Sequence, residues 1–212
     1  MKDKDTASII NLLEKNYGDL KPFLNFSNSF QLLIAVVLSA QCTDKRVNII
    51  TDKLFKLYVK PSDLAEKKIE EFEEEIKTCG MFRNKAKNLI RASKILAEKY
   101  NDAVPENFDA LISLPGVGRK SANVILGTYF NEARFPVDTH VFRVANRIGL
   151  ADSNTPEKTE DDLTKIIPSS LWMKMHRWLI HHGRTYCTAR NPKCSDCFLK
   201  DYCNYYKTLN HH

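Results

Sequence analysis

Apolar residues recur along this chain at intervals of three and four positions, which is the spacing of an amphipathic α-helix. Such stripes run through residues 9–13, 86–100, 141–148 and 171–182. Strict alternation of apolar and polar residues, which would indicate a half-buried β-strand, is hard to find. The pattern therefore predicts an all-α protein.

Residues 30–40 are apolar on every side, which predicts a helix buried at the centre of a domain. The run is too short to cross a bilayer, and no secretory leader precedes it, so we expect a cytoplasmic protein without a membrane contact. Pro61 marks one helix start, and Thr155 before Pro156 marks another, because a threonine cap followed by proline favours a first helical turn.

The composition permits a packed core and adds a weak preference for a polyanionic partner. The chain has 212 residues, 43% of them hydrophobic, which is enough for one large domain or two small domains. Lysine plus arginine number 32 and aspartate plus glutamate 26, which gives a net charge of +6. Because many basic proteins never bind nucleic acid, the charge by itself does not decide the partner.

Four of the six cysteines lie close together near the C-terminus, at Cys187, Cys194, Cys197 and Cys203. In a reducing compartment such a group binds metal more often than it forms disulfides. Four thiolates suit either Zn²⁺ or an iron–sulfur cluster, and this chemistry alone leaves both open. All four ligand positions would be filled by protein, so we expect a structural role.

Two basic residues, Arg190 and Lys193, lie between the first two of these cysteines. A loop held at both ends by metal ligands would present them rigidly. We therefore expect both side chains to contact DNA phosphates.

Residues 114–120, Leu-Pro-Gly-Val-Gly-Arg-Lys, lie between two helical segments. Alternate glycines let the backbone turn sharply and approach a ligand closely. The turn also presents free amides at a helix N-terminus, which is an anion site. We therefore expect Gly116, Val117, Gly118 and Arg119 to contact DNA, although a bare Gly-x-Gly by itself favours an ordinary tight turn between helices.

Lys120 begins the helix that follows this turn. The positive end of the helix dipole and the neighbouring Arg119 both disfavour the ammonium form of the lysine. A neutral amine can attack a sugar C1′ and form a Schiff base. A solvated surface lysine is the alternative interpretation.

Asp138 lies at the expected N-cap of the next helix, where aspartate is a favoured residue. A fixed carboxylate can also stabilise the positive charge that develops on a sugar as its glycosidic bond breaks, and it can accept protons. Two residues further on, His140 either contacts a phosphate or packs inside the protein.

The string at 114–120 resembles the helix-hairpin-helix motif of the endonuclease III family of DNA glycosylases. Residues 137–140, Val-Asp-Thr-His, resemble that family's catalytic-aspartate segment, and the cysteine spacing of six, two and five residues resembles its iron–sulfur loop. The resemblance extends from Ile9 to Tyr206. It implies one [4Fe-4S] cluster held by the four cysteines, Lys120 as Schiff-base nucleophile and Asp138 as electrostatic stabiliser.

Two further segments carry the resemblance, with departures. Residues 38–44, Leu-Ser-Ala-Gln-Cys-Thr-Asp, match a family segment that has alanine in place of Cys42. Gln41 then corresponds to the residue that fills the gap left by an extruded nucleotide, and extrusion is required because the glycosidic carbon is inaccessible in a stacked duplex. Met81 replaces a family leucine that wedges into the base stack. A plain loop residue or core filler is the alternative at both positions.

The resemblance implies two helical domains with a DNA-binding cleft between them. Residues 22–130 would form a helical barrel domain containing the hairpin, and residues 1–21 with 131–212 would form the iron–sulfur cluster domain. Lys120 and Asp138 would face each other across the cleft. The implied activity is that of a monomeric base-excision-repair enzyme, which removes an oxidised pyrimidine from double-stranded DNA and then acts as an AP lyase by β-elimination.

Three other functions compete with this one. A related mismatch glycosylase, specific for adenine or thymine, would have little lyase activity, but such relatives usually have another residue in place of Lys120. A non-catalytic DNA-binding module would use the hairpin alone and would not need Asp138. A zinc-dependent structural protein would use only the four cysteines.

Overall fold

The computed structural model describes residues 3–209 as twelve α-helices and two short 3-10 helices, with no β-strand among these residues. The predicted all-α class is therefore confirmed. Residues 1, 2 and 210–212, which belong to the expected domain ranges, lie outside the described residues. No helix of the described chain combines the length and the apolar character that crossing a bilayer requires.

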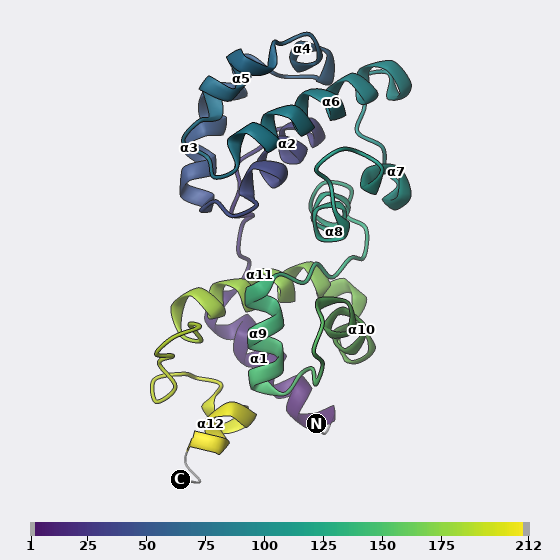
Figure 1. The fold of residues 1–212 in the computed structure, drawn as a ribbon. Coiled ribbons are helices and arrows are strands. Elements are labelled where there is room, and N and C mark those ends of the chain that lie inside the picture. Colours follow the sequence, from purple (N-terminus) through teal and green to yellow (C-terminus); the bar gives the residue numbers. More distant parts are fainter. Residues whose placement is uncertain (1–2, 210–212) are drawn as a thin grey trace. The chain divides into compact units, whose positions relative to one another are not determined.

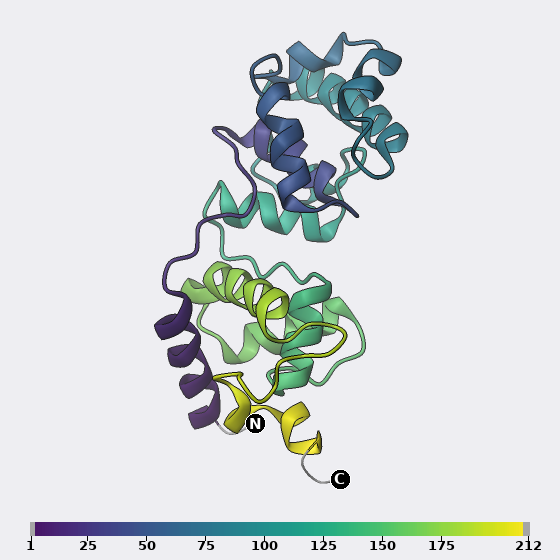
Figure 2. The same ribbon diagram turned by 90° about the vertical axis from the view of Figure 1, so that its left-hand side faces the viewer.

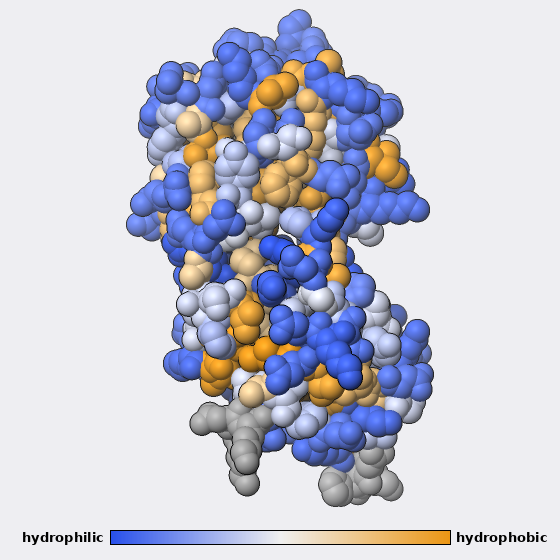
Figure 3. Space-filling model, turned by 180° about the vertical axis from the view of Figure 1, so that it is seen from behind, coloured by the Kyte–Doolittle hydropathy of each residue, from blue (hydrophilic) through white to orange (hydrophobic). Residues whose placement is uncertain are grey.

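The chain divides into two compact units. One unit is Pro22–Glu132, and the other combines Met1–Lys21 with Ala133–His212. We expected the first unit to end at residue 130, so its observed end lies two residues later. Polar side chains cover most of the visible face of both units, interrupted by apolar patches (Figure 3).

The unit Pro22–Glu132 is built around one buried helix (Figure 1). Its helices are α2 (Ser29–Ser39), α3 (Asp44–Leu54), α4 (Pro61–Ala65), α5 (Ile69–Ile76), α6 (Phe82–Tyr100), α7 (Phe108–Ile112) and α8 (Arg119–Thr128). Every residue of α2 from Phe30 to Leu38 is buried, and α2 packs against α3, α6 and α8. The central helix expected from the apolar run is therefore confirmed.

The caps of this unit follow the expected chemistry. The Asn28 side chain accepts a hydrogen bond from the backbone amide of Gln31 and so begins α2. Pro61 is the first residue of α4, as its position in the sequence predicts. Along α6, the apolar stripe faces the core, where Ala86, Leu89 and Leu96 are fully buried.

The second unit pairs helices from both ends of the chain. Its elements are α1 (Asp3–Tyr17), α9 (Thr139–Ile148), α10 (Pro156–Ile166), η1 (Ser169–Leu171), α11 (Trp172–Thr185), η2 (Lys200–Tyr202) and α12 (Asn204–Leu209). Helix α9 packs against α10, α11 and α12, and α1 lies beside α11 (Figure 2). The Trp178 indole N–H donates a 2.8 Å hydrogen bond to the Gly18 carbonyl, which fixes the end of α1 on α11.

Candidate functional site

The turn between α7 and α8 is anchored by two buried apolar residues. Leu114 and Val117 are 2% and 5% exposed, and the Val117 amide donates to the Leu114 carbonyl at 3.1 Å. Gly116 has φ +83°, a left-handed conformation, and a Cβ there would lie 3.0 Å from Asn88. Only glycine fits this position without strain. The glycine in the turn is therefore required by the backbone itself.

One residue of the expected DNA contacts has a different role. Because the Val117 side chain is buried and its amide is bonded within the turn, Val117 holds the hairpin together and presents neither group to a ligand. We therefore correct its assignment as a DNA contact. Gly118, by contrast, is exposed, with open space around the position where a Cβ would be.

Helix α8 begins at Arg119, one residue before the start expected from the sequence. Gly118 is its N-cap and supplies no side-chain acceptor for the first amides. The first N–H groups of a helix have no intrahelical partner, so this end can bind an anion. Arg119 lies over the Phe108 ring at 5.6 Å, and Lys120 is half-buried in the first turn. The lysine thus stands directly beside a group of amides suited to a phosphate.

Asp138 is the N-cap of α9, as predicted. Its Oδ1 accepts hydrogen bonds from the backbone amides of His140 and Val141, at 2.9 and 2.8 Å. Both bonds fix the carboxylate in place, while Oδ2 takes no part in the cap. A half-buried carboxylate in this setting keeps one oxygen for other partners.

His140 faces the protein through one ring nitrogen. Its Nδ1 lies 3.2 Å from a terminal nitrogen of Arg143, and a guanidinium can only donate, so Nδ1 accepts and the ring is neutral. Burial is the main cause that lowers the pKa of His140, and the Asp138 charge opposes it. Of the two roles expected for His140, these contacts support packing.

Gln41 and Met81 lie on two exposed turns of the first unit. Both backbones are left-handed, with φ 52° and 58°, which is uncommon for residues other than glycine. Met81 precedes α6, and 53% of its surface is exposed. The two turns are close neighbours, since a Cβ on Gly80 would lie 3.0 Å from the Gln41 carbonyl oxygen. Strained, exposed residues of this kind are typical of functional loops.

A buried lysine joins these two turns. Lys85 is 5% exposed, and its ammonium donates to the Leu38 carbonyl at 2.8 Å and to the Cys79 sulfur at 3.2 Å. Leu38 lies in the last turn of α2, three residues before Gln41, and Cys79 lies two residues before Met81. One side chain therefore holds both turns from the inside of the unit.

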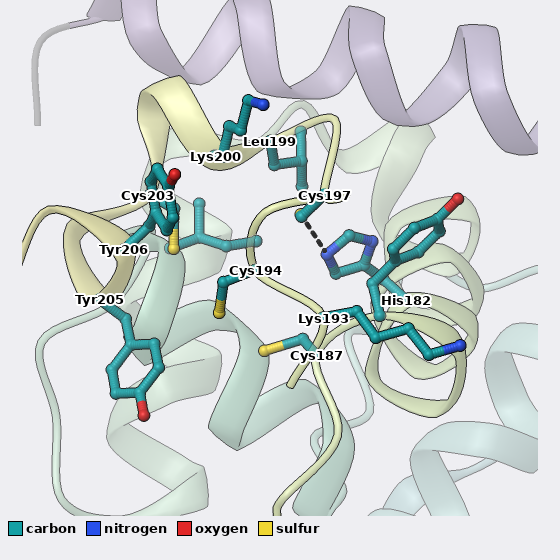
Figure 4. Close-up of a pocket in the computed structure, with 12 residues that line it drawn as sticks. His182, Cys187, Lys193, Cys194, Cys197, Leu199, Lys200, Cys203, Tyr205 and Tyr206 are labelled. Carbon is teal, nitrogen blue, oxygen red and sulfur yellow. Dashed lines mark hydrogen bonds between the residues drawn. The ribbon is translucent and has the colours of Figure 1, made fainter. Parts of the chain in front are cut away.

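The four clustered cysteines line a common hollow after α11 (Figure 4). The sulfur atoms of Cys187, Cys194 and Cys203 face the same space, and Cys197 lies toward His182. Among the described residues, no three His, Cys, Asp or Glu side chains come close enough to hold one metal ion. A [4Fe-4S] cluster takes its four thiolates at separate irons. Four thiols spread around one hollow fit that arrangement.

Burial disfavours ionisation of Cys194, Cys197 and Cys203 and raises the pKa of each thiol. The pKa of Cys197 is raised to about 11, mainly by burial and also by the neighbouring cysteines, although a backbone hydrogen bond with Leu199 lowers it. The pKa of Cys203 is also raised, first by burial, although backbone amides of Tyr205 and Tyr206 lower it. Thiolates here need positive charge nearby, which iron supplies when it binds.

Two arginines of α9 hold the cysteine loop. In the structure, Arg143 Nε donates to the Cys187 carbonyl at 3.1 Å, and Arg147 donates to the Thr188 carbonyl at 2.8 Å. The Arg147 guanidinium also lies 4.6 Å from the centre of the Tyr205 ring. Both arginines therefore contribute to the shape of the loop.

The basic part of the loop is exposed and internally braced. Arg190 and Lys193 are both exposed, as contact with a large polyanion requires. The Thr188 hydroxyl donates to the Arg190 carbonyl at 2.8 Å, and the Lys193 amide donates to the Tyr186 carbonyl at 2.9 Å. The intervening Asn191 is left-handed, with φ 50°.

Comparisons with known proteins agree with these features. Residues 34–169 match the family model of the HhH-GPD superfamily of base excision DNA repair proteins. Residues 187–203, which contain all four clustered cysteines, match the iron-sulfur binding domain of endonuclease III. The chain belongs to the endonuclease III family. This match also decides between the two metals, and the family cofactor is one [4Fe-4S] cluster.

Full-length relatives support the assignment. Endonuclease III of Rickettsia conorii is 49% identical over 209 residues, covering 99% of this chain and all of the relative. Endonuclease III of Escherichia coli K12 is 45% identical over 205 residues, covering 97% of each chain. A solved structure described as a trapped endonuclease III–DNA covalent intermediate superposes with a TM-score of 0.94, at 39% identity and 99% coverage of each chain.

These relationships establish the activity of the chain at the level of its family. It is a base-excision-repair DNA glycosylase with AP lyase activity, and its partner is DNA. A thymine-DNA glycosylase also superposes with a TM-score of 0.85, but at 23% identity this likeness shows the fold alone. The expected family, enzyme class and cofactor are therefore confirmed.

Two residues around these sites were not predicted from the sequence to have a role there: Lys85 and Arg147. A buried lysine has no local signature, because its partners at Leu38 and Cys79 are not its neighbours in the sequence. The same holds for Arg147, whose partners lie 41 residues away.

Proposed function

We propose that the chain removes oxidised pyrimidines from duplex DNA and cleaves the resulting abasic site through a Schiff base on Lys120. The observation that carries this proposal is the position of Lys120 in the first turn of α8, directly after a hairpin with exposed glycine and helix amides. A phosphate held by those amides would bring a sugar next to the lysine.

The chemistry assigned to Lys120 is nucleophilic. Its neutral Nζ bonds to C1′ as the bond from C1′ to the damaged base breaks, and the base leaves with a proton. Ring opening of the sugar gives an imine between Nζ and C1′. Loss of a proton from C2′ then expels the 3′ phosphate oxygen, which cleaves the strand.

Asp138 is proposed as the carboxylate that supports these steps. Positive charge develops on the sugar as the glycosidic bond breaks, and a fixed carboxylate stabilises it. The two amide bonds to Oδ1 support this role, because they hold the carboxylate in one orientation. The same group can accept the proton that the lysine must lose.

DNA contacts are proposed on each unit separately. In the unit Pro22–Glu132, the backbone and side chains of Gly116, Gly118 and Arg119 bind phosphate. Gln41 and Met81, on their exposed turns, enter the base stack. Extrusion of a base leaves a gap that such side chains can fill.

In the second unit, Arg190 and Lys193 bind the DNA backbone from the cysteine loop. Cys187, Cys194, Cys197 and Cys203 are proposed as the cluster ligands, which fold this loop around the metal. A protein of this kind would act as a monomer on double-stranded DNA, in the cytoplasm at the nucleoid.

Borohydride trapping tests the proposed nucleophile, because reduction of a Schiff base leaves a stable protein–DNA adduct. The wild-type protein should form this adduct with a duplex that contains one abasic site, and Lys120→Ala should not. Lys94→Ala, which removes an exposed lysine of α6, is the matched control and should trap normally. If Lys120→Ala traps as well as the control, another amine is the nucleophile.

A panel of duplexes tests the substrate class. Each duplex carries one lesion or mismatch: an oxidised pyrimidine, an oxidised purine, a mispaired adenine or a mispaired thymine. We expect the oxidised pyrimidine to be excised fastest under single-turnover conditions. Faster excision of a mispaired normal base would show that the chain is a mismatch glycosylase.

A further inference from the structure

A tyrosine from the N-terminal helix reaches the cysteine loop through one buried histidine. The Tyr17 hydroxyl lies 2.8 Å from His182 Nδ1. On the other side of the ring, His182 Nε2 lies 3.4 Å from the Cys197 sulfur (Figure 4). These groups come from three parts of the chain, since Tyr17 ends α1, His182 lies on α11 and Cys197 follows the basic loop. All three belong to the same compact unit.

The histidine is held in one orientation by aromatic rings. His182 is 1% exposed, stacks on the Tyr186 ring at 5.5 Å, and meets Phe198 edge-on at 5.3 Å. His182 is almost fully enclosed by aromatic side chains, where a charged ring would lose its hydration, so the ring is neutral. A neutral imidazole has one donor nitrogen and one acceptor nitrogen.

The assignment of Cys197 as an iron ligand determines which ring nitrogen of His182 carries the proton. A cysteine sulfur that ligates iron has lost its proton and can only accept a hydrogen bond, so Nε2 must be the donor. Nδ1 is then the acceptor, and the Tyr17 hydroxyl must donate to it. Burial raises the pKa of Tyr17 to about 12, which keeps this donor protonated.

We propose that Tyr17 is a positioning residue for the cluster, because it fixes the His182 tautomer that donates from Nε2 to the Cys197 ligand. The proposal rests on the assignment of Cys197 as a ligand. A hydrogen bond to a ligating sulfur stabilises the more negative, reduced state of a cluster and so raises its reduction potential. The N-terminal helix thereby sets both the potential and the retention of a cofactor bound at the other end of the sequence.

Tyr17→Phe tests the proposal, because it removes only the hydroxyl and leaves the ring against Phe198 and His181. Without the hydroxyl that donates to Nδ1, the Nε2–H tautomer of His182 is no longer favoured over the Nδ1–H tautomer. The reduction potential of the purified holoprotein should become more negative. At a fixed applied potential, the ratio of reduced to oxidised cluster should therefore fall several-fold. Protein-film voltammetry measures this shift.

The matched control is Tyr206→Phe, which makes the same chemical change at another tyrosine. Tyr206 also lines the hollow but does not belong to the hydrogen-bonded series Tyr17–His182–Cys197. The potential of Tyr206→Phe should equal that of the wild-type protein. If the Tyr17→Phe potential equals that of Tyr206→Phe, the hydroxyl does not act on the cluster and the proposal is wrong.

His182→Gln provides a second measurement that does not depend on voltammetry. Loss of a residue that orients a ligand typically weakens metal binding about 10- to 100-fold. We therefore expect faster loss of the visible cluster absorption to an iron chelator in His182→Gln, and a smaller increase in Tyr17→Phe. Equal rates in wild type, Tyr17→Phe and His182→Gln would also overturn the proposal.

The proposal for Lys120 and the proposal for Tyr17 can be rejected independently of each other. Tyr17→Phe should still give the borohydride adduct at the wild-type level when equal amounts of cluster-loaded protein are compared. Loss of trapping only in Lys120→Ala, with no potential shift in Tyr17→Phe, would reject the role of Tyr17 and keep the nucleophile.

Discussion

The buried ammonium of Lys85 donates a 2.8 Å hydrogen bond to the Leu38 carbonyl, at the C-terminal end of α2. It also donates to the Ala40 carbonyl. The last carbonyls of a helix have no intrahelical partner and carry the negative end of its dipole, so a cation there is favourable. Through this contact one lysine caps α2 and supports the two turns that present Gln41 and Met81.

Lys85→Met should destabilise the protein and weaken its binding to DNA. Hydrogen bonds from a charged group contribute about 1.5–3 kcal/mol each, so the free energy of unfolding should fall by about 2 kcal/mol or more. Urea denaturation measures this change, with the exposed Lys87→Met on the same helix as the control. Equal stability of the two variants would show that the buried lysine is not needed. Below the unfolding transition, affinity for a duplex with an abasic site should also drop, because both turns lose their support.

The two glycines of the hairpin should respond differently to alanine. Gly116→Ala places a Cβ in a left-handed backbone and 3.0 Å from Asn88, so it should cost about 1 kcal/mol or more of stability. Gly118 has φ −96°, and there is open space where a Cβ would lie, so the stability of Gly118→Ala should stay close to that of the wild type. Its added methyl group stands where a phosphate would approach, and DNA affinity should fall. Thermal unfolding with duplex titrations checks both, and the opposite pattern would contradict the structure.

Asp138 combines a cap with a proposed catalytic role, and two substitutions separate them. Asp138→Asn keeps an oxygen that can accept from the His140 and Val141 amides, so stability should change little while excision slows strongly. Asp138→Ala should lose about 1 kcal/mol of stability as well, the usual effect of removing a helix cap. Chemical denaturation and single-turnover excision are measured on the same preparations. Unchanged excision by Asp138→Asn would remove the carboxylate from the reaction.

The stability contributed by His140 should depend on pH. Burial lowers its pKa in the folded state below the ordinary value of 6.5, so the unfolded chain binds the proton more tightly. This contribution is present above pH 6.5 and is lost as pH falls through the lower folded pKa. His140→Asn should therefore lose less stability than the wild type between neutral and mildly acidic pH. Ring-proton NMR should place the folded pKa below 6.5, and a value above it would contradict the Nδ1 contact with Arg143.

Arg147→Lys should loosen the cysteine loop although it keeps the charge. A lysine cannot reproduce the planar donors that reach the Thr188 and Ala189 carbonyls, nor the stacking on Tyr205. We expect faster proteolysis after Arg190 and faster loss of iron to a chelator. Arg184→Lys, at an exposed arginine of α11, is the control. If both variants resist protease equally, the arginine on α9 does not shape the loop.

The predictable part of the fold is the part set by local sequence. Asp138 and Thr155 cap their helices because a short polar side chain reaches only the next few amides. The apolar run that forms α2 is buried because it has no polar face that could be exposed to solvent. Val117 shows the limit of this reasoning, since the motif suggested a ligand contact but the residue anchors the turn from the core.

The chemistry that the sequence by itself indicated, and that is proposed here, is carried by short motifs: the glycine hairpin before Lys120, the aspartate cap at Asp138 and the spacing of four cysteines. Their roles depend on residues within a few positions of one another, so the order of amino acids suffices. Only the tertiary structure decided that Lys85 supports two separate turns, and that Tyr17 and His182, 165 residues apart, meet beside a cysteine. Such contacts depend on how helices pack, and packing brings together groups whose partners no local pattern specifies.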